Sequence, residues 1–321
     1  MIEIEPKDLS IRDIHRYLLG GVQPRPIALV STVSGDGVNN LAPFSFFNAF
    51  GESPPMVAFS TSRRSSDGSL KDTHNNFVET GECVIQSVTH AMVEQVSLAS
   101  AEFPKEVDEF LKSGLTPIDS DIVKPKRVKE SPFQMECRLF RMVPLGDQVR
   151  SGNLAICEVV KFHIAEDIFR DGVIHPDLID LVGRNSAHYY TRASGSAVIE
   201  VPRPDKKGCI GFDCLPEALL RSPTYTPNNL AQFACADSIP TDKKVSAFIE
   251  KVSPFSGDAE LKQLFHRSHR RQDYHAMLRA ALPVYESDRA QGKFLLEKTA
   301  KCALENGGRD FAWKTALFAL R

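Results

Sequence analysis

The segment that decides the fold is residues 41–50, LAPFSFFNAF. Four phenylalanines crowd beside Pro43, and Ser45 and Asn48 supply the only polar side chains. A run this apolar is typical of protein core, whereas a buried Ser or Asn needs hydrogen-bond partners. Pro43 lacks a backbone donor, which favours an edge strand or a bend. Two interpretations stay open: a core strand that ends in a loop, or aromatic walls and backbone groups for a flat heteroaromatic ligand.

Short turns connect this segment to neighbouring strand patterns. Residues 27–34 (IALVSTVS) predict a buried strand, and residues 34–37 (SGDG) predict a hairpin turn, after which a strand over residues 38–45 returns. A further strand is predicted at residues 57–60. Strands joined by such short turns favour an antiparallel sheet over a βαβ unit.

The following 100 residues continue the same alternation. They predict a mainly β fold with α-helices, namely a closed or nearly closed barrel of about six strands with flanking helices. The further strands are expected at residues 83–88, 133–145 and 154–164, and the helices at residues 8–19, 72–81, 90–100 and within 103–112.

A polar loop, residues 63–71 (RRSSDGSLK), precedes the helix that opens at Asp72 and Thr73. The N-terminus of a helix presents free N–H groups and a partial positive charge, and so attracts phosphate. The alternative is a solvated loop that ends in a Thr or Asp helix cap. The hydroxyls and cations that gather here are Ser60, Ser62, Arg63, Arg64, Lys71 and Thr73.

The character of the chain changes after residue 200. Residues 193–207 are typical of a linker, and the spacing of apolar residues beyond them predicts an all-helical extension. We therefore expect one domain over residues 1–200 and a second over residues 201–321. The basic cluster at residues 266–271 (HRSHRR) is interpreted as a solvated face, with a partner or phosphate contact as the alternative.

Composition excludes several classes of function. The chain has 321 residues, 42% hydrophobic and 25% charged, with a formal net charge of −2, so nucleic-acid binding is not expected. No apolar run reaches the roughly 20 residues of a membrane span, and no signal peptide opens the chain, so we expect a cytoplasmic location. Seven cysteines without a CxxC pair indicate reduced thiols, and no metal site is expected.

Several motifs together resemble the flavin reductase-like family, the FMN-binding split barrels that include flavoredoxin. The resemblance covers roughly residues 20–240, and the helices beyond about residue 240 match nothing in the family. It implies a homodimer of six-stranded Greek-key barrels with FMN at the subunit interface. The stretches that carry it are PRPIALVSTVSGDGVNNLAPFSFFNAFGESPPMVAFS, RRSSDGSLKDTHNNF, GLTP, ESPFQMECRL, GNLAICEVV, VGRNSAHYYTR and GFDCLPEALLRSPTYTPNNLA.

The resemblance also implies a division of the site into a ring end and a phosphate end. At the ring end, main-chain groups and Ser45 would meet the isoalloxazine edge, Asn48 would lie near the ring or ribityl chain, and Pro26 and Ile27 would pack near the ring. No catalytic acid or base is assigned, and His188 is retained as a candidate proton donor or stacking group. The predicted cofactor-binding residues are Ala42, Pro43, Phe44, Ser45, Phe46, Asn48, Ser60, Arg63, Arg64, Lys71, Asp72 and Thr73.

Two departures from the family pattern bear on activity. Gln86 stands where the family often has Asn, and the loop after residue 184 carries Asn, Ser and Ala in place of glycines. Three functions therefore remain open. The first is an NAD(P)H-dependent FMN oxidoreductase, the second a flavoredoxin-like carrier that exchanges electrons with a partner protein, and the third an FMN-free interaction protein that works through its helical tail.

Overall fold

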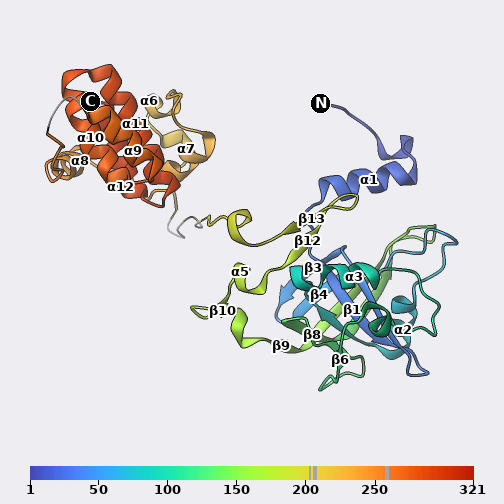
Figure 1. Cartoon of the computed structure of the whole chain (residues 1–321). Helices are drawn as coiled ribbons and strands as arrows, with labels where there is room; N and C mark the ends of the chain where they lie inside the picture. The colour runs from blue at the N-terminus through green and yellow to red at the C-terminus, as the bar shows by residue number, and fades with distance from the viewer. Residues whose placement is uncertain (202–203, 205–207, 257–259) are drawn as a thin grey trace. The chain divides into compact units, whose positions relative to one another are not determined.

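The computed structural model describes residues 1–201, 204, 208–256 and 260–321 (Figure 1). The chain divides into two compact units, Met1–Glu200, here called the barrel unit, and Val201–Arg321, here called the helical unit. Part of the predicted linker, residues 202–203 and 205–207, lies outside the described residues. Among the described residues, the helices are all too short or too polar to cross a membrane.

The barrel unit is built on one antiparallel sheet of seven strands in the order β2-β1-β5-β8-β9-β4-β3. The two edge strands, β2 and β3, are separated in sequence by Ser45 and Phe46 alone. Two residues span only about 7 Å, so the sheet must curl until its edges nearly meet, which makes a split barrel. The strands of this sheet are β1 (Ala28–Val33), β2 (Asn39–Phe44), β3 (Phe47–Glu52), β4 (Pro55–Ser60), β5 (Glu82–Gln86), β8 (Phe133–Pro144) and β9 (Asn153–Ile164).

Pro43 lies on an edge strand as predicted, paired only with Leu29 of β1. Two other details of the sheet differ from the sequence-based prediction. The strand predicted over residues 38–45 begins at Asn39 and ends at Phe44, and the strand β3 that follows it was not predicted. The aromatic segment therefore passes from one edge of the sheet to the other.

The barrel core forms where inward-facing residues of alternating strands meet helix α2. Phe59 of β4 packs between Phe44 of β2, at 5.3 Å between ring centroids, and Phe77 of α2, at 6.1 Å. Cys83, Cys137 and Cys157 belong to the same buried cluster. Burial of three phenylalanines contributes roughly 5–9 kcal/mol of hydrophobic free energy to this unit.

Short helices and two-stranded ribbons surround the barrel (Figure 1). Helix α1 begins after Ser10, whose hydroxyl accepts the Asp13 amide at 3.1 Å, and α2 ends at Gly81, where φ is +71°. The helices are α1 (Ile11–Gly21), α2 (Asp72–Thr80), α3 (Val93–Leu98), α4 (Glu109–Ser113) and α5 (Pro176–Ile179), with 3-10 turns η1 (Pro6–Asp8), η2 (His90–Met92), η3 (Glu166–Ile168) and η4 (Gly195–Ala197). The ribbons are β6 (Pro117–Ile118) with β7 (Arg127–Val128), β10 (Phe169–Arg170) with β11 (Val173–Ile174), and β12 (Val182–Arg184) with β13 (Tyr190–Arg192).

The helical unit has its own core, as the helical spacing predicts. A capping box between Thr226 and Asn229 starts α7, and the Trp313 ring packs 4.8 Å from the Phe233 ring. At Gly292 a Cβ would lie 2.1 Å from the Tyr285 Cα, so the backbones of α10 and α11 touch there. The elements are η5 (Phe212–Cys214), α6 (Glu217–Leu220), α7 (Pro227–Ala234), α8 (Asp242–Ile249), α9 (Leu261–Arg270), α10 (Tyr274–Ser287), α11 (Arg289–Glu305) and α12 (Arg309–Ala319).

Candidate functional site

A cleft of about 370 Å³, here called the α1 cleft, joins helix α1 to the cationic loop before α2. One wall is apolar and comes from α1 and Phe46, and the other carries hydroxyls and cations from residues 62–65 and 71. This volume lies within the range of small-molecule sites. The lining residues are Ile11, Ile14, His15, Leu18, Phe46, Ser62, Arg63, Arg64, Ser65, Lys71, Glu102 and Arg150.

Two arginines organise the loop that forms the polar wall. Arg63 donates through Nη1 to the Gly68 carbonyl at 3.0 Å, and Arg64 donates to the Leu70 carbonyl and to the Asp72 carboxylate, each at 2.7 Å. The charge of Arg64 is therefore largely matched by Asp72. The Arg63 Nε is buried and has no hydrogen-bond partner among the residues that the structure describes. A buried unpaired donor in a cleft wall fits an anionic ligand.

Lys71 stands immediately before α2, at the end of the helix where free N–H groups are exposed. Its ammonium lies 5.7 Å from the centroid of the Phe44 ring. Burial lowers the pKa of Lys71, with Arg64 acting in the same direction while Glu102 and Asp72 raise it. A ligand phosphate would offset this desolvation, because an anion near Lys71 favours the charged ammonium.

A smaller hollow of about 40 Å³ adjoins the polar wall and shares Arg64, Lys71 and Glu102 with the α1 cleft. Ala42, Asp72 and Thr73 line this hollow and do not line the cleft. Thr73 is buried, and its hydroxyl accepts a hydrogen bond from the side-chain amide Nδ2 of Asn40 at 2.9 Å. Thr73 thus supports β2 as well as the start of α2.

The aromatic segment divides among several environments. Phe44 is core, Phe46 is 39% exposed and lines the α1 cleft, and Asn48 lines a separate groove. The Ser45 hydroxyl accepts from Arg25 Nε at 3.3 Å. The aromatic segment and the cationic loop therefore meet at Phe46 and Lys71, which line one cleft.

Two predicted site residues sit in the strands beside the cleft without lining it. Pro43 lies within β2, opposite Leu29. Ser60 is buried at the end of β4, and its amide donates to the Phe46 carbonyl at 2.9 Å. Ser60 thus fixes the backbone at Phe46, which itself faces the cleft.

Arg25, which the sequence analysis did not single out, ties α1 to the barrel. Only 4% of its surface is exposed. Its Nη1 donates to the carbonyls of Leu19 and Val22 at the end of α1, at 3.0 and 2.7 Å, and its Nη2 donates to the Asn185 carbonyl at 3.2 Å. Burial lowers the pKa of Arg25, and Arg184 adds to the effect. Arg25 thus holds the C-terminal end of the helix whose first turns wall the cleft.

Sequence reasoning also missed His15, Glu102 and Arg150 as lining residues. Burial lowers the pKa of His15, and the charges of Arg150 and Arg25 lower it further, which shows how strongly positive this region is. Arg150 belongs to the turn between β8 and β9, about 80 residues beyond Lys71. The one sequence feature that pointed to this cleft was the apolar face of α1, for which no packing partner was predicted.

A larger apolar groove of about 760 Å³ opens on another part of the barrel unit. Pro26 and Ile27, predicted near a ring, line this groove together with Asn48 and Phe162. Gln86, one of the departures from the family pattern, also lines it and is held by hydrogen bonds to the Leu29 carbonyl and the Val128 amide. The groove walls come from residues 24–27 before β1, from β3, β4, β8 and β9, from the end of β5, and from parts of residues 174–183 and 191–193.

The loop that follows β12 stays outside both cavities. His188, Tyr189 and Tyr190 are exposed and do not line the α1 cleft or the groove. The expectation that His188 meets a ligand therefore finds no support within the barrel unit.

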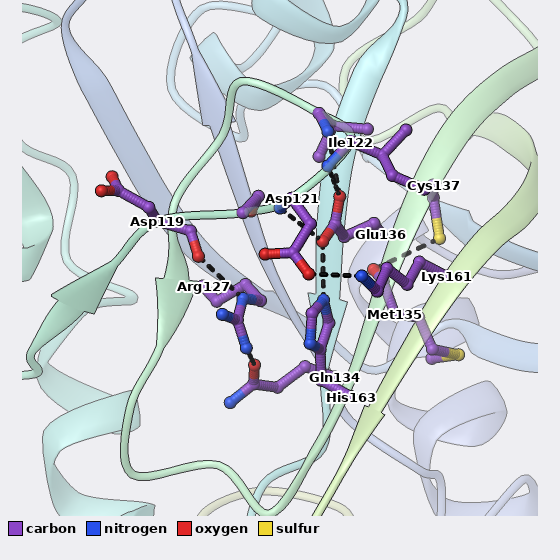
Figure 2. Close-up of polar contacts among 12 residues, drawn as sticks. Asp119, Asp121, Ile122, Arg127, Gln134, Met135, Glu136, Cys137, Lys161 and His163 are labelled. Atoms are coloured by element: carbon purple, nitrogen blue, oxygen red, sulfur yellow. Dashed lines mark hydrogen bonds and ion pairs between the residues drawn. The ribbon is translucent and has the colours of Figure 1, made fainter.

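Asp121, Glu136 and His163 form a cluster that resembles a metal site, since one ligand atom of each lies within 4.8 Å of the others. Figure 2 shows Glu136 between the backbone of residues 121–122 and the His163 ring. The Glu136 oxygens accept from the amides of residues 121–123 at 2.7–2.9 Å and from His163 Nε2 at 2.6 Å. Lys161 already pairs with Asp121. The Glu136 oxygens are already occupied by hydrogen-bond donors, and Lys161 already neutralises Asp121. The cluster therefore anchors the loop at residues 121–123 and offers no metal site.

Comparison with known proteins identifies the family of the barrel unit. The model of the flavin reductase like domain matches residues 21–197 and ends short of the residue 240 reached by the sequence-based resemblance. An uncharacterized protein of Aquifex aeolicus is 36% identical over 201 residues, 62% of this chain and all of that protein.

Two solved structures are similar to the barrel unit. Nitrilotriacetate monooxygenase component B from Bacillus cereus is 33% identical with a TM-score of 0.59, covering 63% of this chain and 98% of that one. The 2-nitrobenzoate 2-nitroreductase NbaA from Pseudomonas fluorescens is 26% identical with a TM-score of 0.55, covering 63% and 96%. On the strength of the domain match over more than half of its length, the chain belongs to the flavin reductase-like family of flavoproteins.

Proposed function

We propose that the barrel unit binds FMN with its phosphate in the α1 cleft and works as an NAD(P)H-dependent flavin oxidoreductase. The observation that carries the proposal is the cleft itself, in which Phe46 and the apolar face of α1 meet the cationic wall at Lys71. A bound flavin accepts hydride without a protein nucleophile, so the chain has to supply position and electrostatics. The names of the two similar solved structures, a monooxygenase component and a nitroreductase, are consistent with redox chemistry on this fold.

The polar wall suits the phosphate end of FMN. Lys71 and Arg150 line the cleft, and neither forms a salt bridge within the described residues. Arg63 Nε offers a buried donor, and Ser62 adds a hydroxyl. A phosphate dianion would bring charge-assisted hydrogen bonds to cations that form no salt bridge in the described part of the chain.

The apolar wall suits the ring end. Ile14 and Leu18 of α1 and the half-exposed Phe46 present apolar surface to the cleft. Because Arg25 fixes the last turn of α1 against the barrel, this wall is held in place before the ligand binds. Main-chain groups at residues 45–46, between the two edge strands, remain the proposed contacts to the polar edge of the ring.

A direct test compares FMN with riboflavin, which lacks the phosphate. Lys71→Ala should raise the Kd for FMN about 10- to 100-fold and leave that for riboflavin nearly unchanged, since a lost charge-assisted contact is worth roughly 1.5–3 kcal/mol. Lys112→Ala is a matched control, because Lys112 also lies over a phenylalanine ring, Phe103 at 5.9 Å, but outside the cleft. Equal losses for both ligands would show that Lys71 does not bind the phosphate.

The proposed activity is tested by the visible absorption spectrum of the purified protein before and after NADH or NADPH. A flavin spectrum that bleaches with either nucleotide, together with steady turnover when flavin is added, is the expected result. A yellow protein that is inert to both nucleotides but is reduced by a partner protein would support an electron carrier. A colourless protein whose melting temperature FMN does not raise would contradict flavin binding altogether.

We also propose that the apolar groove receives a second copy of the chain and forms the interface of a homodimer. The groove is large, and Phe162 within it is 47% exposed, an unfavourable surface for a monomer. Phe162→Glu should convert a dimer to a monomer in light scattering. The matched control is Phe140→Glu, since Phe140 is 64% exposed but lies outside the groove. A wild-type monomer at micromolar concentration would contradict the interface.

A further inference from the structure

The first described residues of the helical unit run beside the end of helix α7. The Ile210 amide donates to the Ala236 carbonyl at 3.0 Å, and the Gly211 amide donates to the Ala234 carbonyl at 3.2 Å. These two backbone hydrogen bonds place Cys209 next to Cys235. Cys209 is exposed, Cys235 is half-buried, and both are free thiols.

The position of Cys235 is fixed from its other side by helix α12. Arg309 donates through Nη1 to the Cys235 carbonyl at 3.3 Å. Two residues earlier, the Phe233 carbonyl accepts from Trp313 Nε1 at 3.2 Å. The backbone at Cys235 is thus held in place, and the segment that carries Cys209 is tied to it by backbone contacts. Closing a disulfide between them needs little movement of the backbone.

We propose that Cys209 and Cys235 form a reversible disulfide when the protein meets a peroxide. The exposed Cys209 thiolate attacks one peroxide oxygen, the O–O bond breaks, and the products are a sulfenic acid at Cys209 and hydroxide. The Cys235 thiolate then attacks the Cys209 sulfur, the S–S bond forms, and hydroxide leaves from that sulfur. The two thiols lose two electrons and two protons, and hydrogen peroxide becomes two waters. A dithiol reductant reverses the bond.

The pH dependence of the oxidation follows from the surroundings of Cys209. Desolvation raises the pKa of the Cys209 thiol, and the charge and hydrogen bond of the neighbouring Cys235 raise it further, while Arg309 opposes the effect. Only the thiolate attacks peroxide, so the rate rises about tenfold for each pH unit below that pKa. The inference concerns the helical unit alone and holds whether or not the barrel unit binds flavin.

The disulfide would close a loop over residues 209–235 that contains η5, α6 and α7. Such a cross-link restricts the unfolded chain and should raise the melting midpoint of the helical unit by about 5 °C or more. Trp313 is the single tryptophan of the chain and packs against Phe233, so its fluorescence reports this unit directly.

The test uses the reduced full-length protein, treated with hydrogen peroxide and then alkylated. Cleavage by trypsin and by a protease that cuts before Asp separates residues 208–212, 213–221 and 222–236, each with one cysteine. The expected product joins residues 208–212 to 222–236, with a loss of 2 Da and the Trp313 midpoint raised. Cys209→Ser and Cys235→Ser should each abolish both changes, with circular dichroism verifying that the variants are folded.

Cys214→Ser is the matched control, because Cys214 is also exposed and close in sequence, but its thiol donates to the Asp213 carboxylate at 3.8 Å. This variant should still form the cross-link. A link between Cys209 and Cys214, a cross-link only between molecules, or two thiols that remain alkylatable after peroxide would each overturn the proposal.

Discussion

The Glu136 cluster offers the sharpest quantitative test of the barrel unit. Glu136 is fully buried, and its two oxygens receive four donors, the amides of Asp121, Ile122 and Val123 and the His163 ring. Glu136→Gln keeps the size of the side chain but replaces one acceptor oxygen with an NH₂ group. That group would face donors, so two hydrogen bonds are lost and N–H groups oppose each other.

The magnitude follows from the pKa of Glu136, which lies at about 2 in place of the usual 4.5. Burial by itself raises this pKa, but the three backbone amides and His163 outweigh it and favour the charged form. A shift of about 2.5 units corresponds to about 3 kcal/mol of stability at neutral pH. We expect Glu136→Gln to lower the free energy of unfolding of the barrel unit by about 3–5 kcal/mol, since it also leaves unpaired donors.

Each unit carries its own probe for the measurement. The core thiols Cys83, Cys137 and Cys157 become alkylatable only when the barrel unit unfolds, so pulse alkylation along a urea series follows that unit. Trp313 fluorescence follows the helical unit, and its urea midpoint should not move. Glu130→Gln is the control variant, because Glu130 is exposed and accepts only the Thr116 amide, at 3.1 Å.

The same residue predicts the pH dependence. Folding lowers the pKa of Glu136, so its contribution is complete above about pH 5 and is lost as the pH falls towards 2. The stability difference between wild type and Glu136→Gln should therefore shrink by about 2 kcal/mol between pH 7 and pH 3, as measured by thermal melts with circular dichroism. A difference below 1 kcal/mol at pH 7, or one that does not change with pH, would refute the reasoning.

Three further outcomes are expected. FMN affinity should fall as the pH rises through the pKa of Lys71, which burial lowers from its usual 10.5, because the neutral amine no longer attracts the phosphate. Riboflavin affinity should show no such step, and parallel titrations by fluorescence quenching check both ligands. Gly292→Ala should lower the Trp313 unfolding midpoint of the helical unit by several degrees, because the new Cβ would clash with the Tyr285 backbone. In native protein the exposed Cys209 and Cys214 should react with a thiol reagent within minutes, and Cys83 should stay protected, because it is buried and its burial raises its pKa.

The predictions that the structure confirms rest on local signals. The turn at residues 34–37 joins an antiparallel pair, and Gly81 ends α2 in the left-handed conformation, because glycine permits a positive φ and its effect on the backbone is local. The same holds for Thr226 and the proline after it at the start of α7. The charged loop before α2 was recognised for the same reason, since its cations and hydroxyls are neighbours in sequence.

The predictions that were wrong or missing concern residues whose position depends on how strands distant in the sequence pair. The aromatic segment was predicted as one strand and a loop, but it divides at Ser45 and Phe46 because the two edges of the curled sheet meet there. Arg25 and Arg150 carry no local signal of a role. One is buried under α1, and the other reaches the cleft only through the turn that joins β8 to β9.

By itself the sequence determined the family, the antiparallel strands and the cationic helix entrance, since each depends on residues close together in the chain. Only the tertiary structure decided that Phe46 shares a cleft with Lys71 while Asn48 lines another surface. Phe46 lies in the two-residue connection between the edge strands and Asn48 lies within β3, so the alternation of one continuous strand does not relate their side chains. Where each side chain points therefore depends on how the two edges of the curled sheet meet.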